Sequence, residues 1–208
     1  MSANGGVKVN KISSISELEQ LYDNAVQTAL DKVRTQLTPR YREWISACRF
    51  VVVSTVGPQG TDASPRGDIG AVVKVLDEHT LLLPDWRGNN RLDSLRNIVE
   101  DGRISLLFMV PGSDNVVRIN GSAELTADRD YTSRFDDHNR QPRSVIVIHI
   151  AEIYFQCAKA LMRSQLWEVN ARNTQLPSAG DFIKEFNADF DGESYDSGYE
   201  EYARERMW

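Results

Sequence analysis

The sequence predicts a mainly β protein, a small antiparallel barrel of six strands with flanking helices. From residue 50 onward the apolar residues gather in short, β-branched runs, and turn-length connections separate most of these runs. Short connections favour antiparallel pairing over alternating strand–helix–strand units, and six strands close most naturally into a small barrel. A chain of 208 residues suits one compact domain with terminal decorations.

Six apolar runs supply the expected strands. In chain order they cover residues 50–56, 71–76, 80–83, 103–110, 116–125 and 143–155. Glycine, proline, aspartate and asparagine mark turns between several of them. A helix over residues 91–100, with its apolar side chains on one side, interrupts the series, and a short helix is expected over residues 128–136.

The sequence of the N-terminal region predicts two helices. Ser16 and Glu19 have the spacing of a capping box, and an apolar face then continues to Val33. Pro39 limits this helix, and a shorter helix is expected over residues 40–49. The predicted division is a helical extension packing on the barrel (1–49), the barrel domain (50–170) and an acidic helical or extended tail (171–208).

Composition narrows the class of protein. A net charge of −6 argues against a general nucleic-acid binder, which needs a basic surface. The sequence has neither the pattern of a secretory signal nor an apolar run near the about 20 residues of a membrane helix, so a cytoplasmic protein without membrane or nucleic-acid partners is expected. Cys48 and Cys157 are far apart and the three histidines lack ligand spacing, so we expect neither a disulfide framework nor a metal site.

The stretch from residue 84 to residue 94 is the most informative for function. Asn90 is a candidate N-cap with Asp93 at capping-box spacing, and the free amides of a helix N-terminus favour a phosphate. Arg91 would add a charge-assisted contact, and Ser94 a hydroxyl. The same residues also fit an ordinary capped helix behind a polar loop.

Three further features carry positive charge. Arg66 lies between a proline and a glycine, which suits either a guanidinium held near a ligand or a surface turn. Lys159 and Arg163 share one helical face, as in many solvated helices. Arg118 interrupts a strand rich in valine and isoleucine, so it either forms an ion pair on the outer face or reaches into a pocket.

Four motifs in order resemble the FMN-binding split-barrel superfamily of pyridoxamine 5'-phosphate oxidase. They are SPRGD (64–68), GNNRLDSLRNI (88–98), RINGSAEL (118–125) and CAKALMRSQLW (157–167), and together they are similar to a subgroup of FMN-dependent enzymes. The resemblance implies a six-stranded antiparallel split barrel whose first hairpin spans residues 50–68. It also implies a homodimer with two FMN molecules at the subunit interface.

The resemblance also implies roles for single residues. Arg66 would lie along the FMN phosphate and ribityl chain. Asp85 and Trp86 would lie where the end of their strand passes the flavin, and Arg118 would lie near the ring. The phosphate-gripping segment would comprise Asn89, Asn90 and Arg91, with Ser94 one turn further. The partner chain would contribute Lys159, Arg163, Ser164 and Trp167.

The expected function is that of an FMN-dependent oxidoreductase acting on a small organic substrate, with no catalytic residue identified. True pyridoxamine phosphate oxidases carry a C-terminal Arg-x-His segment that this chain lacks, so oxidation of vitamin B6 is not expected. One alternative is a flavin- or haem-binding protein without turnover. Another is a reductase that uses a deazaflavin with a long acidic tail, against which the acidic C-terminus argues.

Overall fold

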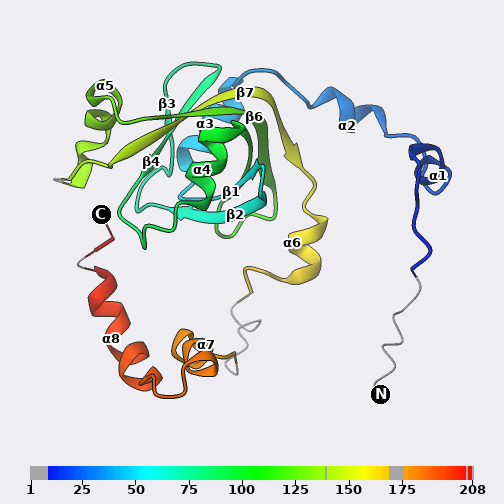
Figure 1. Ribbon diagram of the computed structural model, residues 1–208. Coiled ribbons are helices and arrows are strands. Elements are labelled where there is room, and N and C mark those ends of the chain that lie inside the picture. Colours follow the sequence, from blue (N-terminus) through cyan, green and yellow to red (C-terminus); the bar gives the residue numbers. More distant parts are fainter. Residues whose placement is uncertain (1–8, 139, 169–175, 205, 208) are drawn as a thin grey trace, which may run out of the picture. The chain divides into compact units, whose positions relative to one another are not determined.

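The computed structural model describes residues 9–138, 140–168, 176–204 and 206–207, and the chain divides after Lys32 into two compact units. The second unit is built on a seven-stranded antiparallel sheet with the strand order β2-β1-β5-β6-β7-β4-β3 (Figure 1). The strands are β1 (Phe50–Gly57), β2 (Gly60–Gly67), β3 (Lys74–Val75), β4 (Thr80–Asp85), β5 (Arg103–Met109), β6 (Val116–Thr126) and β7 (Ser144–Gln156).

The prediction of a closed, six-stranded barrel is wrong in two details. The additional strand is β2, which the local pattern did not include but which the resemblance implied as half of the first hairpin. Among the described residues no ladder joins β2 to β3, so hydrogen bonds do not close the sheet. Neither edge favours closure, because β3 is two residues long and Pro65 in β2 has no N–H to donate.

Burial of alternate residues explains most strands. In β1 the side chains of Val51, Val53 and Thr55 are buried while their neighbours are half-buried, which is the period of a strand with one core face. β4 is buried from Thr80 to Pro84, because a second apolar cluster covers its other face. The centre of the main core is formed by Ile45, Val51, Val53, Leu81, Leu83, Ile98, Leu106, Phe108, Ile119, Ile146, Ile148 and Ile153.

The second unit also contains helices. They are α3 (Pro39–Ala47), α4 (Asp93–Glu100), α5 (Arg129–Thr132), the 3-10 helix η1 (Ser133–His138), α6 (Lys159–Ser164), α7 (Ala179–Phe186) and α8 (Gly192–Arg204). Helices therefore form close to the expected ranges 40–49, 91–100 and 128–136. The Thr38 hydroxyl caps α3 by accepting from the Tyr41 N–H, and Pro39 occupies the first turn, where its missing N–H costs nothing.

The position of α4 matters most for the site. Leu95 and Ile98 turn its apolar side into the core, against β1, β2 and β6 (Figure 1). The Asn97 side chain donates to the Thr55 hydroxyl at 3.1 Å, and a Cβ at Gly57 would collide with Asn97. This close contact fixes the helix over the first hairpin.

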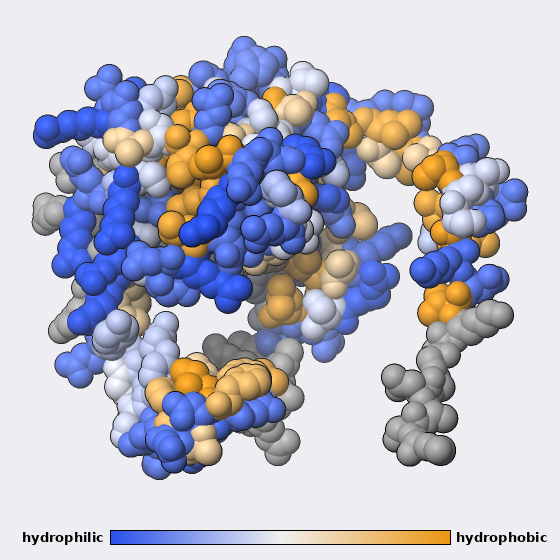
Figure 2. Space-filling view, in the orientation of Figure 1, coloured by the Kyte–Doolittle hydropathy of each residue, from blue (hydrophilic) through white to orange (hydrophobic). Residues whose placement is uncertain are grey.

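The first unit differs from its prediction. A single helix over residues 16–33 is wrong, because the structure has two short helices, α1 (Ile15–Glu19) and α2 (Gln27–Asp31). The cap is Ser14, whose hydroxyl accepts from the Glu17 N–H, rather than Ser16. Neither helix has a buried residue, so no core supports a longer one, and Figure 2 shows hydrophobic side chains on the surface of this segment.

No helix in the part of the chain that the structure describes is long and apolar enough to cross a membrane. The predicted domain boundaries at residues 49 and 170 stay predictions.

Candidate functional site

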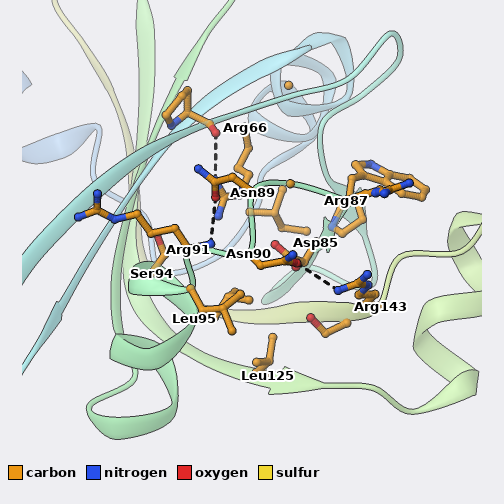
Figure 3. A pocket seen from close by; sticks show the side chains of 18 of the residues that line it. Arg66, Asp85, Arg87, Asn89, Asn90, Arg91, Ser94, Leu95, Leu125 and Arg143 are labelled. Atoms are coloured by element: carbon orange, nitrogen blue, oxygen red, sulfur yellow. Dashed lines mark hydrogen bonds between the residues drawn. The ribbon is translucent and has the colours of Figure 1, made fainter. Parts of the chain in front are cut away.

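A cavity of about 540 Å³ lies where β2, β4, the loop before α4 and the start of β7 meet. Its described lining includes a cationic side and an apolar side (Figure 3). The lining residues that carry charge are Arg66, Asp85, Arg87, Arg91 and Arg143. The apolar side includes Val72, Leu83, Pro84, Leu95 and Leu125. Seven of the twelve sequence-predicted site residues line the cavity: Arg66, Asp85, Trp86, Asn89, Asn90, Arg91 and Ser94.

Arg66 reaches this cavity because of the strand register. It lies opposite Val51 in the β1–β2 ladder, so its side chain points to the same side of the sheet as the buried Val51. Its Nη1 donates to the Ser64 hydroxyl at 2.5 Å and to the Pro65 carbonyl at 3.1 Å. The guanidinium is thus held half-buried at the cavity wall by its own strand.

Asp85 and Trp86 end β4 beside the cavity. Asp85 pairs with Ser144 in the β4–β7 ladder. Burial raises the pKa of Asp85, and the positive charges of Arg66 and Arg143 partly offset this rise. The Trp86 Nε1 donates to an Asp68 carboxylate oxygen at 3.2 Å, which fixes the indole at the rim.

The loop before α4 differs from its prediction. The helix begins at Asp93, and its N-cap position, Leu92, has no side-chain cap, so the expected N-cap at Asn90 is wrong. Two side-chain contacts of the loop explain the difference. The Asn89 Oδ1 accepts from the Arg91 N–H at 3.0 Å, and the Asn90 Oδ1 accepts from Arg143 Nη1 at 3.2 Å (Figure 3). Asn90 also has a φ of 60°, a conformation that asparagine tolerates better than most residues.

Arg91 and Ser94 are present at the cavity but already have partners. The Arg91 Nε donates to an Asp93 carboxylate oxygen at 2.5 Å, and Figure 3 shows the Arg91 guanidinium pointing away from Arg143 and Asp85. The buried Ser94 hydroxyl donates to the Asp62 carboxylate. The two groups expected to bind a phosphate are therefore each held by a carboxylate.

Arg143 is a charged lining residue of the cavity that the sequence reasoning missed. It comes directly before β7, and the pairing of Ser144 with Asp85 brings it beside the end of β4. The two segments are far apart in sequence, so only the β4–β7 ladder reveals this neighbourhood. Arg87 was also missed, although it lies within the predicted loop.

The other five predicted residues lie outside this cavity. Arg118 donates to the Gln156 Oε1 at 3.3 Å, and its guanidinium carbon lies 5.4 Å from the centre of the Tyr154 ring. In α6 the side chains of Lys159, Arg163 and Ser164 are exposed. Beyond it, the Trp167 Nε1 donates to the Ser113 carbonyl at 2.8 Å. The roles assigned to these residues at a partner subunit stay predictions.

The described residues contain no group of three or more histidine, cysteine, aspartate or glutamate side chains that could hold a metal ion. Cys48 is a core residue whose thiol donates to the carbonyls of Phe50 at 2.9 Å and Met109 at 3.1 Å. Burial raises the pKa of the Cys48 thiol, so it is a structural group and not a nucleophile.

Comparison with known families adds an observation independent of this geometry. Residues 37–157 match the family model for pyridoxamine 5'-phosphate oxidase, a span that contains all seven strands and α4. The chain belongs to the pyridoxamine 5'-phosphate oxidase family. This confirms the superfamily that the four motifs indicated, and the matched span contains every described lining residue of the cavity except Met207.

Solved structures similar to this chain match a little over half of it. HupZ from Group A Streptococcus is 19% identical with a TM-score of 0.47, over 56% of this chain and 91% of HupZ. A NimC/NimA family protein from Clostridium acetobutylicum is 13% identical with a TM-score of 0.44, over 58% and 87% of the two chains. An FMN-binding protein from Syntrophomonas wolfei is 18% identical with a TM-score of 0.39, over 68% and 93%. These low scores leave the family model as the basis of the assignment. A search of curated proteins found no match.

Proposed function

We propose that the cavity beside the β4–α4 loop binds FMN and that the protein is an FMN-dependent oxidoreductase of its family. The observation that carries this proposal is the convergence of arginines from three segments on one cavity with an apolar wall. Arg66 comes from β2, Arg87 and Arg91 from the loop, and Arg143 from the residue before β7. A phosphate matches the arginines, and the face of an aromatic ring matches the apolar wall.

The lining fits FMN in size and in charge. A volume of about 540 Å³ lies within the roughly 300–1,000 Å³ of small-molecule sites. Asp85 is the one acid among the described residues that line the cavity, against four arginines, so the lining attracts an anion such as a phosphate dianion. On the other side, Leu95 and Leu125 offer contacts to the face of an aromatic ring (Figure 3).

The flavin, when bound, supplies the two-electron redox chemistry, and the protein supplies position and environment. Arg66 is suited to the phosphate end, because its own strand already holds the guanidinium in place. Asp85, half-buried between Arg66 and Arg143, offers a carboxyl for a polar edge of the ring or of a small organic substrate. Oxidation of pyridoxamine phosphate itself is not proposed, because the chain lacks the Arg-x-His segment.

We further propose that the working unit is a homodimer. Lys159, Arg163 and Ser164 are exposed and lie outside the cavity of their own chain, which is the placement that contribution to a second copy requires. Arg118 also lies outside the cavity, half-buried on β6. Light scattering over a dilution series measures the assembly state, and a monomer at micromolar concentration would contradict this part of the proposal.

The decisive experiment is the visible absorption spectrum of the purified protein, repeated after addition of excess FMN and desalting. A retained two-band flavin spectrum is expected, and a fluorescence titration then gives the affinity. A colourless protein that does not retain FMN would overturn the cofactor and the oxidoreductase proposals together. Retained FMN that neither a nicotinamide nucleotide nor another donor reduces would favour a binding protein without turnover.

A further inference from the structure

Arg91 lines the main cavity, but its guanidinium points away from Asp85 and Arg143 (Figure 3). Its Nε donates to the Asp93 carboxylate at 2.5 Å, with 79% of the Arg91 side chain and 46% of the Asp93 side chain exposed. The pKa of Arg91 is raised by its hydrogen bond to Asp93, by the charge of Asp93 and by the charge of Asp62. Two carboxylates therefore compete with any phosphate for this guanidinium.

Ser94 is engaged in the same way. Its hydroxyl has one proton, which it donates to the Asp62 carboxylate, and the side chain is 4% exposed. While this hydrogen bond persists, Ser94 cannot donate to a phosphate. The carboxylate that holds Ser94 comes from β2, whereas the carboxylate that holds Arg91 comes from α4.

A second cavity of about 250 Å³ lies behind the loop and makes the local charge less favourable to an anion. Arg91 is the residue that lines both cavities. The charged residues of this second cavity are Arg91 and Arg96 against Asp62, Asp93 and Glu100. A phosphate drawn to Arg91 thus meets more carboxylates than guanidiniums on that side.

We propose that Asp93 and Asp62 are specificity determinants that lower the affinity of the site for the phosphate of FMN, by holding Arg91 and Ser94. This inference rests on the proposed function. Because Asp93 and Asp62 hold Arg91 and Ser94, the phosphate contributes less to the binding free energy of FMN than its charge alone would give. The affinity for FMN should therefore lie closer to that for riboflavin, which lacks the phosphate, than it would without these carboxylates. In the complex with FMN, the phosphate would have to replace Asp93 as the partner of Arg91.

The test is a pair of titrations, with FMN and with riboflavin, on the full chain and its variants. Asp93→Asn should tighten FMN binding about fivefold, the upper range for an exposed ion pair, and leave riboflavin unchanged. Asp62→Asn should also tighten FMN binding. It replaces Asp93→Asn as the test if loss of the Asp93 charge weakens the first turn of α4. In an Arg91→Ala background, Asp93→Asn should lose most of its effect, because the contested group is gone.

Asp101→Asn is the matched control. Asp101 binds Arg103 through the same two-residue spacing, with an Nε to Oδ1 distance of 2.6 Å, at the other end of α4 and outside both cavities. It should change neither titration. Unchanged FMN affinity in both Asp93→Asn and Asp62→Asn would overturn the inference while leaving the FMN proposal intact, and equal shifts for FMN and riboflavin would do the same. Failure of the original chain and every variant to bind FMN would instead overturn the proposed function, and this inference with it.

Discussion

Two of the segments expected at the cofactor, the β4–α4 segment and α6, have basic residues in different surroundings. The segment from β4 to α4 is bordered by β2 and β7, so its Arg87 and Arg91 line the same cavity as Arg66 and Arg143. In α6, Lys159 and Arg163 stand exposed on a six-residue helix with no buried residue. The difference teaches that strand pairing brings the first segment to a cavity within one chain, whereas Lys159 and Arg163 lie outside that cavity.

The largest expected effect is on FMN affinity, from a residue that lines the cavity. Arg66→Ala should weaken FMN binding roughly tenfold to a hundredfold, which corresponds to a charged hydrogen bond of about 1.5–3 kcal/mol. Fluorescence titration with FMN measures it. Arg40→Ala is the control, because it removes the same charge from an exposed pair with Glu43 on α3. Equal loss in both variants would mean that net charge alone, and not this cavity, attracts the cofactor.

A smaller effect is expected from α6. Replacing both Lys159 and Arg163 by alanine should weaken FMN binding by roughly tenfold at most, because both side chains are exposed and screened in the single chain. The sharper measurement uses a heterodimer of a tagged double mutant and an unchanged chain. Flavin should be lost from the cavity of the unchanged chain. Loss confined to the mutant chain's own cavity would show that α6 serves its own subunit.

The smallest effect concerns stability. Because burial raises the pKa of Asp85 in the folded state, its ionised form destabilises the fold above that pKa. Asp85→Asn should therefore raise the melting temperature at pH 7, by less than about 4 °C after screening by solvent. The gain should shrink as the pH falls through the folded pKa and vanish below the unfolded value of about 3.9.

Asp101→Asn should change the melting temperature at neutral pH in the opposite direction, lowering it. The hydrogen bond from Arg103 lowers the pKa of Asp101, so the ionised carboxylate stabilises the fold above its unfolded pKa, and this contribution is lost as the pH falls through the folded pKa. Thermal melts of the two variants across pH 3 to 8 should thus diverge in sign at neutral pH. Parallel curves would show that the environment of Asp85 is not the desolvated one described above.

Local pattern predicted the elements whose signal lies within a few residues. The short β-branched run over residues 50–56 indicated β1, and the apolar side with Leu95 and Ile98 indicated α4. It did not predict the break between α1 and α2, because a periodic apolar face favours a helix only where a core receives that face. Nor did it include β2, whose polar sequence becomes a strand because β1 satisfies its backbone.

The same limit applies to the site. The sequence of the loop indicated that Asn89, Asn90, Arg91 and Ser94 are candidate phosphate ligands, and all four line the cavity. The sequence did not indicate their partners: Asn90 binds Arg143, Arg91 binds Asp93, and Ser94 binds Asp62. Two of these three contacts join residues at least thirty positions apart.

The sequence by itself determined the family, the β-rich character and the loop that carries the candidate phosphate ligands, since these depend on residue order and short-range periodicity. Only the tertiary structure decided that the sheet has seven strands and stays open, that Arg143 joins the cavity, and that carboxylates hold Arg91 and Ser94. The physical reason is that register and long-range pairing set which side chains meet, and a single strand's sequence does not encode its partner's position.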